Sequence, residues 1–223
     1  MLRRTRLRTT SLIVWIAGAM AALSLSASPA SAGPNATTYR VTAAGRTTGV
    51  EAFSLVPLPN TVRFVDRVTG AHILCPSTAL SGYWQLGKAL TGAGVARVGS
   101  GTFRCTGAMT TGTVVGHLAS PMRINVTEPG GHYEQGGHIG GVNIVFVDEE
   151  HAACSFAIIG QVRMLVLLRP HSSSLQPLTE QSTLRIADVV GCDGRVAVGD
   201  HVLSFGYFQV ITPHPPLVMG SNP

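Results

Sequence analysis

Charged side chains are scarce in this chain, and no run of basic residues follows its first ten positions. Asp, Glu, Lys and Arg together make up 12% of the 223 residues, and the formal net charge is +5. Four of the 16 basic residues, Arg3, Arg4, Arg6 and Arg8, stand at the N-terminus. Without those four the net charge is +1, so nucleic-acid binding, which needs clustered Lys and Arg, is not expected.

The sequence also lacks an apolar run long enough to cross a bilayer. The apolar stretch at residues 12–23 is shorter than the ~18 to 20 residues that a membrane span needs. It follows the N-terminal arginines and leads into small residues, where Ala30 and Ala32 occupy the two positions that a signal peptidase reads. This order of segments is typical of a secretory signal peptide, and a retained anchor is the alternative.

We therefore expect residues 1–32 to be a signal peptide that is cleaved before Gly33. Residues 33–223 are then a single secreted, extracellular all-β domain with no membrane attachment after cleavage. The pair Arg3-Arg4 leaves both the general and the twin-arginine export route open.

Local catalytic motifs are missing as well. No serine lies in a G-x-S-x-G elbow, no glycine-rich segment ends in G-K-[ST], and no H-E-x-x-H occurs. The only acidic cluster, Asp-Glu-Glu-His at 148–151, fits a solvated turn, since glycosidase acids must flank one bond and adjacent strand-end residues diverge. We expect no catalytic residue and no cofactor, which favours a non-enzymatic protein.

One glycine-rich segment could still carry metal chemistry. Residues 130–141 place His132, Glu134 and His138 within seven residues, and zinc favours imidazole and carboxylate ligands. The spacing matches no established zinc motif. A glycine-rich hairpin turn with exposed polar side chains is the simpler interpretation, because histidine is commonly a surface residue. No metal site is therefore expected, and these three residues are kept as candidates.

Four cysteines remain after cleavage: Cys75, Cys105, Cys154 and Cys192. An even count in an exported protein indicates disulfides, and neither C-x-x-C nor a Cys/His zinc spacing occurs. Three pairings are possible on the count alone.

Short segments that alternate apolar and polar residues indicate an all-β domain. The clearest puts Met122, Ile124 and Val126 on one face of a strand. About a dozen such runs lie between Gly, Pro, Asn and Asp, and none has helical periodicity. The sequence predicts an antiparallel β-sandwich or barrel of about a dozen short strands.

Similar short motifs occur in the same order in the two halves of the chain, and this repetition favours one of the three cysteine pairings. Phe-Val-Asp at 64–66 precedes Cys75 as Phe-Val-Asp at 146–148 precedes Cys154, and Gly82 and Gly160 follow. Cys-Thr-Gly and Cys-Asp-Gly then close the halves at Cys105 and Cys192. This pattern predicts a duplicated β unit with disulfides Cys75–Cys105 and Cys154–Cys192, and chance similarity between short β motifs is the alternative.

The surroundings of the cysteines resemble those of a known family. They are Leu-Cys-Pro-Ser at Cys75, Phe-Arg-Cys-Thr-Gly at Cys105, Cys-Ser-Phe at Cys154 and Val-Gly-Cys-Asp-Gly at Cys192. Together with the C-terminal strand that follows Gly-Asp at 199–200, they resemble small secreted actinobacterial four-cysteine proteins of unknown function. Directly before Cys154, Ala153 stands where members of that family usually have a glycine. The resemblance covers nearly all of residues 33–223 and implies no catalytic residue.

Three functions are compatible with these features. The leading hypothesis is a non-enzymatic secreted scaffold that contacts a cell-envelope component or another protein. The second is a barrel that binds a small apolar ligand inside, suggested by the apolar run Met-Leu-Val-Leu-Leu at 164–168. The third is a secreted metal-dependent hydrolase that uses His132, Glu134 and His138.

Overall fold

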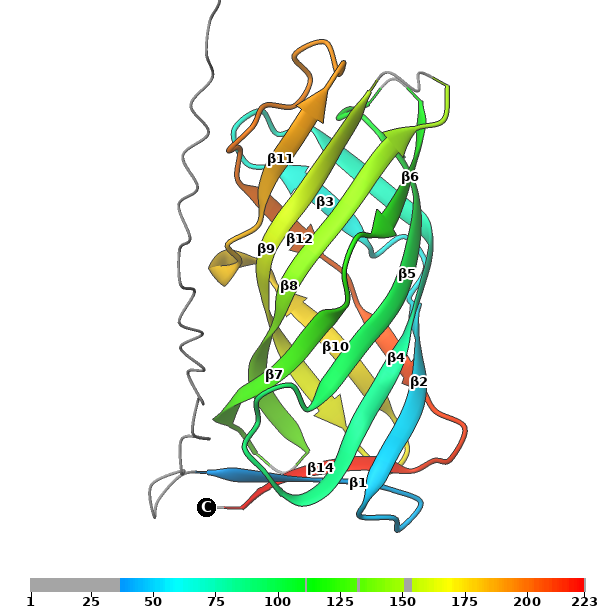
Figure 1. Ribbon diagram of the computed structural model, residues 1–223, viewed down its shortest axis with the longest axis vertical. Coiled ribbons are helices and arrows are strands. Elements are labelled where there is room, and N and C mark those ends of the chain that lie inside the picture. The colour runs from blue at the N-terminus through cyan, green and yellow to red at the C-terminus, as the bar shows by residue number, and fades with distance from the viewer. Residues whose placement is uncertain (1–36, 111, 132, 151–153, 223) are drawn as a thin grey trace, which may run out of the picture. The chain divides into compact units, whose positions relative to one another are not determined.

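The computed structural model describes residues 37–110, 112–131, 133–150 and 154–222, and these residues form an almost entirely β structure (Figure 1). They belong to one compact unit, Ala32–Pro223. The cleavage residues Ala30, Ala32 and Gly33 and the candidate ligand His132 lie outside the described residues.

Fourteen strands make up one antiparallel sheet. In chain order they are β1 (Thr38–Ala43), β2 (Gly49–Pro57), β3 (Arg63–Asp66), β4 (His72–Leu90), β5 (Ala96–Gly107), β6 (Thr113–Leu118), β7 (Met122–Pro129), β8 (Glu134–Asp148), β9 (Ser155–Leu168), β10 (Ser173–Leu178), β11 (Arg185–Val190), β12 (Val202–Phe205), β13 (Phe208–Ile211) and β14 (Leu217–Asn222). One 3-10 turn, η1 (Thr179–Gln181), lies between β10 and β11. No helix in the described ranges is long and apolar enough to cross a membrane.

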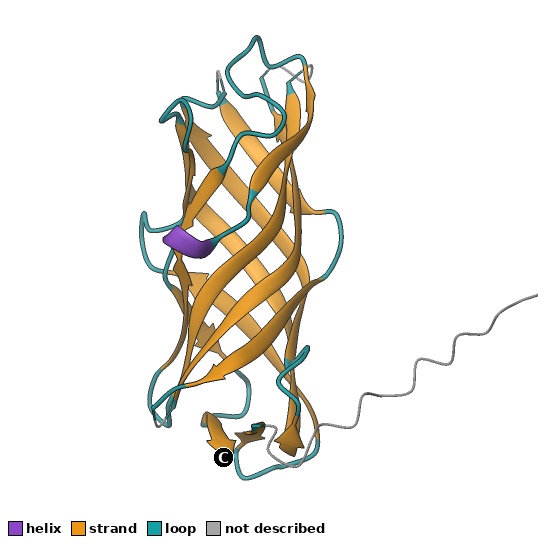
Figure 2. Ribbon diagram, turned by 90° about the vertical axis from the view of Figure 1, so that its left-hand side faces the viewer, coloured by secondary structure: helices purple, strands orange, loops and turns teal. Residues whose placement is uncertain are grey.

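Alternating side chains explain why these segments are strands. In β7, Met122, Ile124 and Val126 are buried while Arg123 is exposed, as the sequence predicts. Successive side chains of a strand point to opposite faces, so this alternation gives the sheet one apolar face and one polar face. The apolar face lines the inside of a closed structure, and the polar face is the outer wall (Figure 2).

The sheet closes into a barrel with eight strand positions. Four positions are single long strands, namely β4, β5, β8 and β9. The other four are each filled by two short strands in line, which are β2 with β3, β6 with β7, β10 with β11, and β12 with β13. Neighbouring positions follow the chain order. The eighth position pairs with the first, through β12 with β3 and β13 with β2, and this pairing closes the ring of eight positions. Of the two predicted architectures, the chain therefore adopts the barrel.

The first and last strands cover one end of this barrel. β1 and β14 pair along their whole length, with Thr38 opposite Asn222, and β1 also pairs with the last residues of β4. Figure 1 shows this terminal ribbon, β1 with β14, lying across the barrel end. Its side chains Tyr39, Val41, Leu217 and Met219 are buried, so the ribbon seals that end with apolar groups.

Aromatic side chains fill the barrel near its other end. Phe64 and Phe146 come from opposite walls, the first and fifth positions, yet their ring centroids lie 5.7 Å apart. Phe103 and Phe156 complete the cluster, at 6.2 and 5.3 Å from Phe146. Edge-to-face and stacked rings at such distances are in direct contact, so side chains occupy the barrel cross-section at this level.

Both disulfides bridge strands within one half of the chain. Cys75–Cys105 joins β4 to β5, and Cys154–Cys192 joins the residues that flank β9 and β11. The predicted pairing is therefore confirmed. Both bonds lie at the barrel end opposite the terminal ribbon, and disulfides of this kind indicate an oxidising compartment.

Each half of the chain contributes four of the eight barrel positions, and some repeated motifs lie at corresponding positions in the two sets. The first and fifth positions both end in Phe-Val-Asp, and in each case the aspartate accepts the N–H two residues later, Val68 for Asp66 and Glu150 for Asp148. Gly82 and Gly160 in the second and sixth positions both face a backbone carbonyl of the next position, too close for a Cβ. The structure thus places matching sequence elements at matching barrel positions.

Two features differ from the sequence-based expectation. The predicted short strands include long ones, because β4 has 19 residues and β8 has 15. The segment at 130–141 is not a hairpin turn throughout, because β8 begins at Glu134. Its glycines serve a close strand approach, since a Cβ on Gly137 would collide with the backbone oxygen of Asn125 on β7.

Candidate functional site

The structure separates two of the three candidate metal ligands. Glu134 and His138 both project from the outer wall of β8, because Gln135 between them is fully buried and points inward. Four residues along a strand span about 13 Å. No group of three His, Cys, Asp or Glu side chains that could hold a metal occurs among the described residues. Glu134 and His138 therefore extend from points on β8 that lie about 13 Å apart along the strand.

His138 instead lines a hollow of about 500 Å³ on the outer wall. The hollow lies between β7, β8, the start of the terminal ribbon and the turn that joins β4 to β5. We call it the β7–β8 hollow, and its polar lining residues are Thr37, Tyr39, Thr91, Asn125, Thr127 and His138.

Asn125 and His138 form an ordered pair at this hollow. They are opposite each other on β7 and β8, and the Asn125 amide nitrogen lies 3.2 Å from His138 Nε2. The other end of the amide is fixed, because the Gly94 N–H donates to Asn125 Oδ1 at 2.7 Å. Since an amide nitrogen only donates, Nε2 accepts and the imidazole proton sits on Nδ1. The Nδ1–H of His138 and the second amide hydrogen of Asn125 therefore remain as donors for a ligand in the hollow.

Tyr39 brings a hydroxyl group to the same place. The residue is only 2% exposed, and its hydroxyl has no hydrogen-bond partner within the described residues. Burial raises the pKa of Tyr39 above its usual value of 10.0, and the negative charge of Glu128 raises that pKa further. The hydroxyl consequently keeps its proton at neutral pH and can donate it.

The charges beside the hollow cancel each other. Glu128 at the end of β7 accepts from Arg163 on β9 at 2.5 Å. Arg163 is also the strand partner of His138, so this ion pair borders the Asn125–His138 pair. The lining itself contains no Lys, Arg, Asp or Glu, which leaves the hollow polar and close to neutral.

A second polar cluster anchors the terminal ribbon. Glu51 of β2 is 1% exposed and accepts from the Arg46 guanidinium, while the backbone N–H and Nδ1 of His214 both lie 3.1 Å from its Oε1. Arg46 belongs to the turn after β1, and His214 belongs to the segment before β14. The buried carboxylate therefore ties both connections of the terminal ribbon to the barrel wall, which is a structural role.

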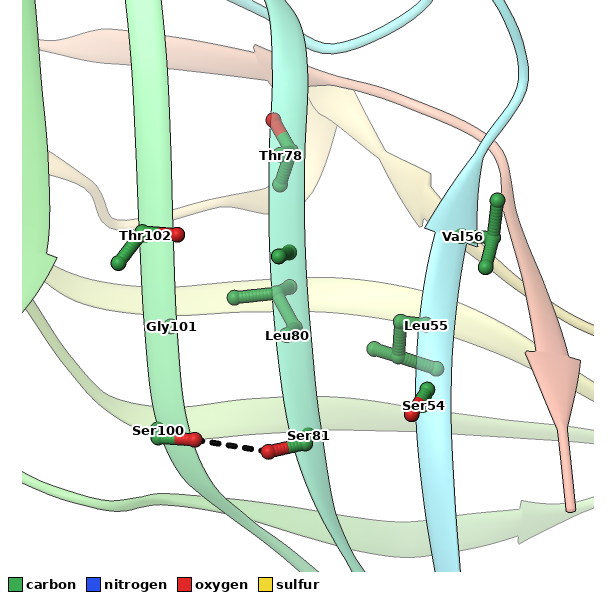
Figure 3. A pocket seen from close by; sticks show the side chains of 10 residues that line it. Ser54, Leu55, Val56, Thr78, Leu80, Ser81, Ser100, Gly101 and Thr102 are labelled. Carbon is green, nitrogen blue, oxygen red and sulfur yellow. Dashed lines mark hydrogen bonds between the residues drawn. The ribbon is translucent and has the colours of Figure 1, made fainter. Parts of the chain in front are cut away.

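Another outer hollow, of about 320 Å³, lies over β2, β4 and β5. Figure 3 shows its small side chains, with the Ser81 and Ser100 hydroxyls 2.7 Å apart across two strands. No titratable side chain lines it, so it offers less chemistry than the β7–β8 hollow.

Sequence reasoning found His138 but missed its surroundings. Asn125 lies in the alternating segment between Ile124 and Val126 but in none of the chemical motifs above, and Tyr39 belongs to no motif at all. The alternation of β7 puts Asn125 on the outer face, which is the one signal that could have placed it beside a neighbouring strand. The acidic cluster also differs from a fully solvated turn, because Asp148 is buried and Glu149 pairs with Arg104 at 2.7 Å.

The chain was also compared with known proteins. Searches against family models, curated proteins and solved structures found no match.

Proposed function

We propose that this chain is exported and that its barrel works outside the cytoplasm as a non-catalytic binding module. In this proposal the barrel contacts a cell-envelope component or another protein through its outer wall. The observation that carries the proposal is the contact between Phe64 and Phe146 across the barrel. Side chains occupy the cross-section at this level, which favours the outer wall as the surface for recognition.

The other features support the same function. Two buried disulfides suit a protein that persists in an oxidising, extracellular setting. Exposed side chains of the outer wall, such as Ser100 and Thr127, help to line the hollows described above. An apolar ligand inside the barrel would need interior space, and the Phe64–Phe146 contact occupies the cross-section at one level, so we rank that function second.

The test begins with expression of the full chain in a secreting bacterial host. N-terminal sequencing of the protein in the medium is expected to start at Gly33, because Ala30 and Ala32 satisfy the small-residue rule. The purified product is then mixed with isolated cell envelopes and sedimented, and we expect it to appear in the pellet.

A reduced and alkylated sample is the matched control, since it has the same composition without the disulfides. Retention of the protein inside the cells would contradict the proposal. So would turnover of ester, peptide or glycoside substrates that His138→Ala abolishes, because that result would make the module an enzyme.

A further inference from the structure

We infer that the β7–β8 hollow binds a neutral, hydroxyl-rich ligand, namely a saccharide unit of an envelope polysaccharide. This inference rests on the proposed extracellular function and assigns it a site and a class of ligand.

The size of the hollow suits such a ligand. Its volume of about 500 Å³ lies within the range of about 300 to 1,000 Å³ that is typical of ligand sites. Thr91 and Thr127 at its rim are exposed, so the hollow opens to solvent and can admit the end or a side branch of a polymer.

The hydrogen-bonding groups of the lining match sugar hydroxyls. Each threonine hydroxyl can donate and accept, as each sugar hydroxyl can. His138 offers Nδ1–H, and Asn125 keeps a second amide hydrogen after bonding to His138. The Tyr39 hydroxyl lines the hollow and has no hydrogen-bond partner in the described chain, so a ligand oxygen that reaches it can accept its hydrogen.

The charge of the site selects against ionic ligands. An anionic ligand would need a free cation, but the guanidinium of Arg163 is already paired with Glu128. A cationic ligand would need a free carboxylate, but the carboxylate of Glu128 is already paired with Arg163. An apolar ligand would leave the amide, imidazole and hydroxyl groups without partners, which carries a desolvation cost. A neutral polar ligand remains.

The lining also predicts the strength of binding. It has no exposed aromatic face for a sugar ring to stack on, because Tyr39 is buried. We therefore expect weak binding of a short oligosaccharide, with a Kd of about 0.1 to 1 mM. A polymer that presents many copies to barrels on one surface would bind more tightly through avidity, which favours a polysaccharide over a free sugar.

The test uses the secreted product of the full chain on a glycan array. The array carries neutral oligosaccharides of hexoses, pentoses and N-acetylhexosamines beside sulfated and uronic-acid oligosaccharides. We expect binding to neutral members only. The variants Tyr39→Phe and Thr127→Ala, each of which removes one hydroxyl, should weaken binding about threefold to tenfold. The matched controls Tyr83→Phe and Thr102→Ala, on the outer wall of β4 and β5, should leave it unchanged.

Envelope sedimentation separates the sources of the ligand. Periodate treatment of the envelopes, which cleaves sugar diols, should abolish sedimentation, and protease treatment should not. Free monosaccharides at about 10 mM should compete only partly, because a polymer binds through many units.

Three results would overturn the inference. They are binding to the anionic glycans alone, neutral binding that neither variant weakens, and envelope binding that survives periodate but is lost after protease. The last two still leave an exported module that binds through its surface. Failure of export or of envelope sedimentation instead contradicts the proposed function. The array needs the exported protein, but its result does not depend on sedimentation with envelopes.

Discussion

Glu51 is a buried carboxylate whose partners should matter for stability. Arg46→Ala removes its guanidinium partner and leaves the buried carboxylate with His214 alone. We expect the free energy of unfolding to fall by about 1 to 3 kcal/mol, because a buried acceptor loses a charge-assisted hydrogen bond. Chemical denaturation measures this loss.

Arg40→Ala is the control for this prediction. Arg40 lies on β1 of the same terminal ribbon, is exposed, and forms no ion pair within the described part of the chain. Equal effects of the two substitutions would show that Glu51 does not depend on Arg46.

Tyr39 makes stability depend on alkaline pH. Its pKa is raised in the folded protein, first by burial and then by Glu128, so the folded state holds the proton more tightly than the unfolded chain. This contribution is complete below pH 10.0, the ordinary tyrosine value, and is lost as pH rises through the higher folded pKa. The unfolding free energy should thus fall as the pH rises above 10.0, and it should fall less for Tyr39→Phe. Parallel pH profiles of the two proteins would contradict this.

At the scale of elements, each disulfide closes a loop of similar length. The paired cysteines are 30 residues apart in the first half and 38 in the second. In the chain-entropy model each bond stabilises the fold by roughly 3 to 4 kcal/mol. Replacing both cysteines of either pair by alanine should lower the unfolding free energy by about that amount. A loss under about 1 kcal/mol for either pair would mean that the reduced chain is already constrained.

Strand length follows from how the barrel is built. β4, β5, β8 and β9 run through a position without a break, whereas breaks such as the one between β2 and β3 divide the other positions. Proline helps to mark such breaks, since Pro57 ends β2 and Pro121 precedes β7. In the sequence each of these breaks interrupts the alternation of apolar and polar residues and so looks like the end of a strand. The alternation therefore predicts many short strands, and it does not show that two of them lie in line within one barrel position.

At the scale of the whole molecule, the paired ends of the terminal ribbon allow the chain to be reconnected. Thr38 lies opposite Asn222, so a short Gly/Ser linker from Asn222 to Thr37 can join them. Opening the chain between Gly130 and Gly131, which lie between strands, keeps every strand pairing. We expect this circular permutant, exported behind a separate signal, to form both disulfides and unfold cooperatively.

A second permutant, opened inside β8 between Ile144 and Val145, is the matched control. It interrupts the pairing of β8 with β6 and β9, and it should fail to fold. If the first permutant also failed, the link between the two halves would be essential to the barrel.

The candidate site depended on structure far more than the fold did. His138 stands in a conspicuous glycine-rich segment, so composition alone draws attention to it. Its partners Asn125, Gly94 and Tyr39 come from three other segments of the chain. Local spacing relates His138 to Glu134, but strand geometry directs those two side chains to separate places on the wall.

The sequence by itself determined that the domain is all-β and that each half carries its own disulfide, because alternation and motif order are local properties of the chain. The tertiary structure alone decided between sandwich and barrel, and it alone set the pairing of β3 with β12 that closes the ring. Alternation says which face of a strand is buried but not which strand lies beside it, since the backbone hydrogen bonds of a sheet are the same for every sequence. The Asn125–His138 pair of the hollow likewise depends on the register of β7 against β8, which places these two residues opposite each other.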